Sequence, residues 1–151
     1  MKVALIYTTK REKATVAAVR WMTSALREEG AQVEILHPHE VSDLQYDGFF
    51  IGSSVYKGQV SLELLEFLVQ NREALCHKPV AVFVVCKEKQ HPELHAQLIL
   101  SRLKGDAVSW IPIEGYILRK GGFDKQRPAV EGWTRDTLAK MIRNGQHGET
   151  D

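Results

Sequence analysis

Residues 79–86, Pro-Val-Ala-Val-Phe-Val-Val-Cys, form the segment that most limits what this chain can fold into. Seven of these eight residues are apolar or cysteine, and valine, whose β-branched side chain favours extended backbone, predominates. A strand that is apolar at successive positions needs cover on both faces, as in a parallel sheet flanked by helices. We therefore predict a central strand of such a sheet.

Shorter apolar runs elsewhere alternate with segments of helical periodicity. Strands are expected at residues 3–7, 32–36, 47–51, 79–86 and 108–118. Helices are expected from the loop after Lys13 to Gly30, from Ser61 to near residues 71–73, from Pro92 to Gly105, and from about Pro128 to Arg143. Within them, Leu62, Leu94 and Leu98 are among the side chains expected to face the core.

The alternation of strand and helix predicts right-handed crossovers and a doubly wound α/β fold. We expect a three-layer sandwich with a five-stranded parallel sheet in the order 2-1-3-4-5, formed by one domain at residues 1–143 and followed by a polar tail at 144–151. In such a sheet, ligands bind beyond the carboxyl ends of the strands where strand order reverses. The loops at 8–15 and 53–58 are then predicted to be neighbours.

Composition excludes several classes of function. A formal net charge of +1, from 20 basic and 19 acidic residues, gives no field that would attract nucleic acid or an acidic membrane. No apolar run approaches the length of an integral membrane segment, and the chain begins with a strand instead of a signal peptide, which predicts a cytoplasmic protein. The two cysteines, Cys76 and Cys86, lack metal-binding spacing and are expected to be reduced thiols.

The segment at residues 47–58, Asp-Gly-Phe-Phe-Ile-Gly-Ser-Ser-Val-Tyr-Lys-Gly, predicts a strand that ends at a ligand. We expect a small-residue turn from Gly52 onward, where the backbone can approach a flat or anionic group closely. Ser53 and Ser54 supply hydroxyls, and Tyr56 supplies an aromatic face against which a ring can lie.

The loop after the first predicted strand has the composition of a phosphate site. Thr8 and Thr9 supply hydroxyls, and Lys10 and Arg11 supply positive charge at a helix N-terminus, where amide dipoles attract anions. Neither GxGxxG nor GxxxxGK[ST] occurs, which argues against a nicotinamide dinucleotide fold and a nucleoside triphosphatase. A phosphate at this loop and a ring at the next describe riboflavin phosphate, FMN.

The sequence resembles the flavodoxin-domain proteins grouped with menaquinone-dependent protoporphyrinogen oxidase. The similarity lies in Tyr7-Thr8-Thr9 with Thr15, in residues 47–58, and in Asn71-Arg-Glu-Ala-Leu followed by Lys78-Pro-Val-Ala-Val-Phe. It implies a flavodoxin-like fold and FMN as the cofactor of an oxidoreductase or electron-transfer protein. It also implies that the cofactor-binding residues are Thr8, Thr9, Lys10, Arg11, Thr15, Ser53, Ser54, Val55, Tyr56, Lys57, Gly58, Cys86 and Lys87.

The resemblance further implies a redox partner protein or a small-molecule electron donor or acceptor, while a homodimer stays open. One departure from the family supports an alternative function. The loop between Thr9 and Thr15 contains no glycine, although tight backbone turns around phosphate favour glycine. The alternative is a flavodoxin-like domain that binds no FMN and acts as an interaction module.

Histidines offer a weaker signal for a metal site. His91 and His95 are four residues apart, a metal-ligand spacing on a helix, but no third ligand stands beside them in the sequence. His37 and His39 flank Pro38, and a turn accounts for them. We expect solvated side chains at all four positions.

Overall fold

The computed structural model describes residues 1–10, 12–86, 91–115 and 122–149. Its strands are β1 (Lys2–Thr8), β2 (Gln32–Leu36), β3 (Gly48–Tyr56), β4 (Gln59–Val60), β5 (Val80–Cys86) and β6 (Ser109–Glu114). Its α-helices are α1 (Glu12–Glu28), α2 (Leu62–Gln70), α3 (Arg72–Leu75), α4 (Pro92–Ser101) and α5 (Arg127–Glu149). Two short 3-10 helices, η1 (Pro38–Glu40) and η2 (Asp124–Gln126), complete the set of described helices.

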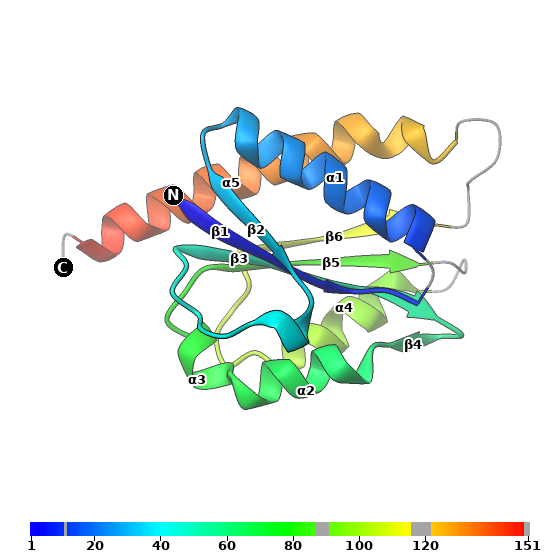
Figure 1. Ribbon diagram of the computed structural model, residues 1–151, viewed down its shortest axis with the longest axis horizontal. Helices are drawn as coiled ribbons and strands as arrows, with labels where there is room; N and C mark the ends of the chain where they lie inside the picture. The colour runs from blue at the N-terminus through cyan, green and yellow to red at the C-terminus, as the bar shows by residue number, and fades with distance from the viewer. Residues whose placement is uncertain (11, 87–90, 116–121, 150–151) are drawn as a thin grey trace.

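The sheet confirms the predicted topology. Its parallel strands run in the order β2-β1-β3-β5-β6, which is the predicted order when strands are counted without the short β4. Figure 1 shows α1 and α5 on one face of the sheet and α2, α3 and α4 on the other. The one strand outside the predicted set, β4, pairs antiparallel with the end of β3.

The apolar segment predicted as a central strand is β5, which lies between β3 and β6. All of its side chains are buried. Val82 and Val84 pack into the core beneath α2 and α4, while Phe83 and Val85 pack into the core beneath α1 and α5. The continuous apolar run thus reflects cover on both faces.

The fifth predicted strand is shorter than expected. It spans Ser109–Glu114 as β6, and the expected residues 116–118 lie outside the described part of the chain. Pro112 lies within this strand, where it cannot donate a hydrogen bond to a neighbour. The position is tolerated because β6 is the last strand in the order and pairs only with β5 among the described strands.

Three predicted buried positions on the helices facing β3 and β5 are wrong. Leu62 is 68% exposed, Leu94 is 58% exposed and Leu98 is 36% exposed. Ile99 faces the core as expected, and Ala96 completes the inward side of α4; both are fully buried. A short helix that is apolar on most sides carries more apolar residues than one face can bury, so periodicity alone does not select among them.

The helix that Ser61 caps ends at Gln70, next to the predicted end near Asn71. Asn71 leaves helical geometry, and its side-chain amide donates to the Phe67 carbonyl at 2.8 Å. The helix on the other face, α5, continues to Glu149 instead of ending at Arg143. The predicted polar tail is therefore helical through Glu149, since no proline interrupts it.

Candidate functional site

A cleft lies at the carboxyl ends of β1 and β3, where strand order reverses. Its volume is about 750 Å³, within the range of pockets that hold small molecules and cofactors. Its lining residues are Thr8, Thr9, Lys10, His37, Ser54, Tyr56, Lys57, Gln59, Val60, Ser61, Leu62 and Glu63. The loop after β1 and the end of β3 thus line one cleft.

Hydroxyl groups join the two segments at the base of the cleft. The backbone amide of Lys10 donates to Ser54 Oγ at 3.3 Å. The hydroxyl of Thr8 donates to Ser53 Oγ, also at 3.3 Å, and Thr8 pairs with Ser53 in the parallel ladder. These bonds fix the start of the loop against β3.

Ser53 lies behind the cleft and does not line it. It is fully buried, its hydroxyl donates to the Ser54 carbonyl at 2.7 Å, and its oxygen accepts the Ser61 amide at 3.2 Å. Ser61 in turn caps α2 by accepting the Leu64 amide. Ser53 therefore holds the start of α2 to the sheet, and any contact with a ligand falls to Ser54.

Tyr56 is the last residue of β3 and stands in the cleft wall, half-buried. The Lys10 ammonium lies 5.9 Å from the centre of its ring, and the Lys57 ammonium lies 5.5 Å from it. Both distances are within cation–π range, so the ring is bordered by positive charge from each of the two segments.

The predicted small-residue turn at Gly52 is wrong, because β3 continues as a strand through Tyr56. A Cβ atom at Gly52 would lie 2.3 Å from the Phe83 ring, so glycine makes room for a neighbouring core side chain. The turn falls instead at Lys57 and Gly58, whose φ angles of 51° and 73° suit a two-residue hairpin. This hairpin leads into β4.

Several of the predicted cofactor-binding residues lie away from the cleft surface. Val55 is 3% exposed and belongs to the core beneath α2, and the Gly58 position is exposed in the hairpin turn. Thr15 is fully buried in α1, and its hydroxyl oxygen has no hydrogen-bond partner among the described residues. Arg11 and Lys87 lie outside the described residues.

Cys86 ends β5 and is buried, with 4% of its surface exposed. Burial raises the pKa of the Cys86 thiol to about 11, and the negative charge of Glu93 adds to that shift. The thiol therefore stays protonated at neutral pH and has little nucleophilic character.

Neither His37 nor residues 59–63 were predicted to line the cleft. The hairpin could have been recognised from Lys57-Gly58 between apolar segments, which would have turned the chain back along the cleft. His37 follows β2, and only the tertiary fold brings it to the cleft. No local pattern indicates that contact.

Comparison with known proteins identifies the family. Residues 5–110 match the model of the family described as Flavodoxin domain. No curated protein is significantly similar to the chain in sequence. Among the described helices, none has the length and apolar character required to cross a bilayer.

Solved structures share the fold at low sequence identity. Oxidised flavodoxin 1 from Bacillus cereus is 16% identical with a TM-score of 0.67, covering 95% of this chain and 98% of its own. The flavodoxin of Streptococcus pneumonia TIGR4 is 14% identical with a TM-score of 0.72, covering 93% and 99%. A flavone reductase is 10% identical with a TM-score of 0.66, covering 94% and 63%.

Proposed function

The chain belongs to the Flavodoxin domain family, and from this premise we propose that it is an oxidoreductase or electron-transfer protein that binds FMN in the cleft. The observation that carries the proposal is the junction of two segments at this cleft. Hydroxyls and a lysine come from the loop after β1, and an aromatic ring comes from the end of β3. Phosphate and flavin ring need these two kinds of surface.

The buried hydroxyl of Thr15 supports a fit to the phosphate. A buried hydroxyl without a partner costs free energy, because it has lost water and gained no replacement bond. Among the described residues, Thr15 and Thr23 have such hydroxyls, and of the two only Thr15 follows the loop that carries Thr8, Thr9 and Lys10. A phosphate at this loop would offer an acceptor to that hydroxyl. The donor set therefore fits an anion.

The residues of the chain then divide the binding between them. Thr9 and Thr15 would donate hydroxyl hydrogen bonds to phosphate oxygens, and Lys10 would contribute positive charge. Thr8, whose hydroxyl donates to Ser53 Oγ, would hold the loop in place. Ser54 positions the loop by accepting the Lys10 amide. Tyr56 covers the flavin ring, with the main chain after Cys86 proposed to contact its pyrimidine edge.

FMN supplies hydride and electron chemistry when bound, so no acid–base pair or nucleophile is required of the protein. The role of the chain is to bind the ring, exclude water from one side of it and set its potential through contacts. The subgroup of protoporphyrinogen oxidase-like flavodoxins is the finer proposal, supported by residues 47–58. An electron carrier and a dehydrogenase of a porphyrinogen-like substrate both agree with this site.

One observation favours the alternative of a cofactor-free interaction module. Residues 10–14 contain no glycine to ease a tight turn around a phosphate.

The flavin content of the purified protein separates the two functions. An FMN-binding protein is yellow, or takes up one FMN per chain with measurable heat in a calorimetric titration. A colourless protein that gives no heat with FMN supports the interaction module and contradicts the proposal.

A further inference from the structure

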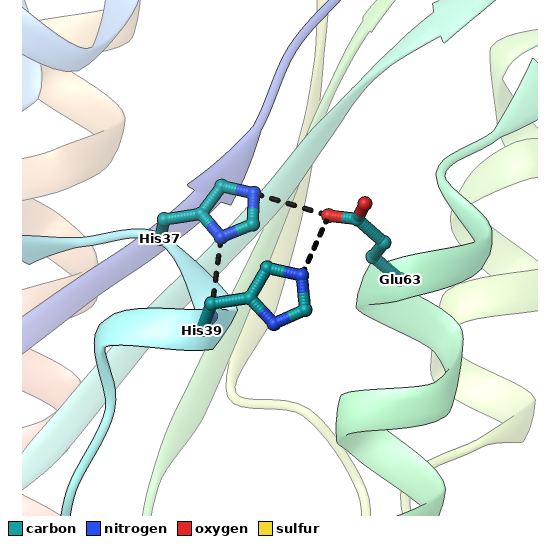
Figure 2. A group of neighbouring side chains, drawn as sticks. All are labelled: His37, His39 and Glu63. Carbon is teal, nitrogen blue, oxygen red and sulfur yellow. Dashed lines mark hydrogen bonds and ion pairs between the residues drawn. The ribbon is translucent and has the colours of Figure 1, made fainter.

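Two imidazoles and one carboxylate converge at the edge of the cleft (Figure 2). His37 directly follows β2, His39 lies in η1, and Glu63 lies in the first turn of α2. Glu63 Oε2 lies 3.1 Å from His37 Nε2 and 3.5 Å from His39 Nε2. Among the described residues, this is the one group of three or more potential ligands whose atoms all lie within 4.8 Å.

We propose that His37, His39 and Glu63 bind a divalent transition-metal ion, with Zn²⁺ as the representative ion. Imidazole nitrogen and carboxylate oxygen are both zinc ligands, and imidazole also suits Ni²⁺ and Cu²⁺. None of the three residues belongs to the proposed FMN-binding set, although His37 and Glu63 line the same cleft. The metal site therefore does not rest on the proposed flavin function, and flavin-free protein tests it separately.

The spacing of the three groups agrees with this chemistry. Ligands about 2.1 Å from a tetrahedral metal ion lie about 3.4 Å from one another. The two nitrogen-to-oxygen distances of 3.1 Å and 3.5 Å are close to that edge length. The two imidazoles are further apart, but the His39 side chain is 75% exposed and can rotate toward the ion without disturbing the core.

The position of the group leaves one coordination site open. His37 and Glu63 both line the cleft, whereas His39 lies toward solvent. A catalytic zinc site has three protein ligands and a fourth position for water or a substrate, whereas a structural zinc site has four protein ligands. A bound ion would also join η1 to the start of α2.

The competing explanation is a helix cap. His37 Nδ1 accepts the His39 amide at 3.1 Å, so this nitrogen lacks a proton and Nε2 carries it toward Glu63. Metal binding at Nε2 requires the other tautomer and the loss of that one hydrogen bond. The second bond of the cap, from the His37 amide to Glu40 Oε1 at 2.7 Å, is retained. The start of η1 therefore survives the exchange.

The test is a calorimetric titration of untagged, metal-stripped and flavin-free protein with Zn²⁺. The variants are His39→Gln and Glu63→Gln, each of which removes one ligand and leaves the His37 cap intact. The matched control is His91→Gln, because His91 Nδ1 also faces a carboxylate, Glu93 Oε1, at 3.2 Å, but the described residues bring no third ligand to that pair. Circular dichroism shows that each variant is folded.

We expect one Zn²⁺ per chain, with affinity at least about tenfold lower in both ligand variants and unchanged in His91→Gln. Co²⁺ should give the visible absorption of a four-coordinate ion in the wild type, and His39→Gln should lose it. The proposal is overturned if the wild type and all three variants bind Zn²⁺ equally, or if none of them binds it.

Discussion

The backbone amide of Lys10 donates to the hydroxyl of Ser54 at 3.3 Å, which joins the loop after β1 to β3 across 44 positions of sequence. The two halves of the proposed FMN site are therefore held together by a side chain that also lines the cleft. This contact makes Ser54 the first residue to change.

Ser54→Ala removes the acceptor of the Lys10 amide and should loosen the loop. We expect FMN affinity to fall by about 1 kcal/mol, or roughly fivefold, as for the loss of one hydrogen bond. Calorimetric titration with FMN measures the effect. Ser101→Ala is the matched control, because the Ser101 hydroxyl bonds only locally, to the Leu98 carbonyl and the Arg102 side chain. Equal losses in both variants would contradict a specific role for Ser54.

Tyr56→Ala removes the ring proposed to cover the flavin. We expect the binding free energies of FMN and of riboflavin to weaken by the same amount, about 0.5–1.5 kcal/mol, because the two ligands share the ring and differ in the phosphate. Tyr56→Phe, which keeps the ring, should bind both ligands nearly as the wild type does. Unchanged affinity in Tyr56→Ala would remove Tyr56 from the site.

Gly52→Ala should destabilise the fold, since the added Cβ would meet the Phe83 ring at 2.3 Å. Overpacking of this kind costs about 1–3 kcal/mol of unfolding free energy, measurable by urea denaturation. Gly132→Ala is the matched control: it lies in α5, and apart from its chain neighbours and the nearby backbone of the helix, no described atom lies within 4 Å of the added Cβ. That variant should gain about 0.5–1 kcal/mol. Wild-type stability in Gly52→Ala would show that the contact is absent.

The stability of the protein at alkaline pH should depend on Tyr46. Its pKa is raised from 10.0 to about 12, first by burial, then by its hydrogen bond to Glu34 and by the charges of Glu34 and Asp43. Between pH 10.0 and about pH 12, the Tyr46 hydroxyl keeps its proton in the folded protein and has lost it in the unfolded chain. The stabilisation is therefore complete below about pH 10 and is lost as the pH rises to about 12.

Tyr46→Phe tests this dependence, because it cannot ionise. Urea denaturation below and within the alkaline window should show a shallower fall of unfolding free energy in Tyr46→Phe than in the wild type. The two proteins differ only in the Tyr46 hydroxyl, so the difference between their slopes reports on that group. Identical slopes would mean that Tyr46 ionises equally in the folded and unfolded states.

The sequence was sufficient for the sheet because its signals are local. The apolar run at 79–86 and the alternation of strand and helix predict a parallel sheet with this strand inside it, as the structure shows. Gly52 was misread because glycine indicates a turn and also makes room for a close side chain, here Phe83. Only the packing of the folded sheet shows which of these two roles Gly52 has.

The cleft was only partly predictable for a similar reason. Thr8 and Ser54 were recognised because each stands at the end of a predicted strand facing the same edge. The approach of His37 to Glu63 depends on where η1 and α2 lie after folding, and no spacing in the sequence encodes it. Side-chain contacts between elements that are distant in sequence could therefore not be predicted and are seen only in the folded structure.

The most direct test of the central claim compares the quenching of flavin fluorescence when the wild-type protein is titrated with FMN and with riboflavin. The proposed site predicts that both flavins are quenched and that FMN binds more tightly, because only FMN carries the phosphate for the loop after β1. If neither flavin is quenched at any protein concentration, the cleft is not a flavin site and the proposed function is wrong.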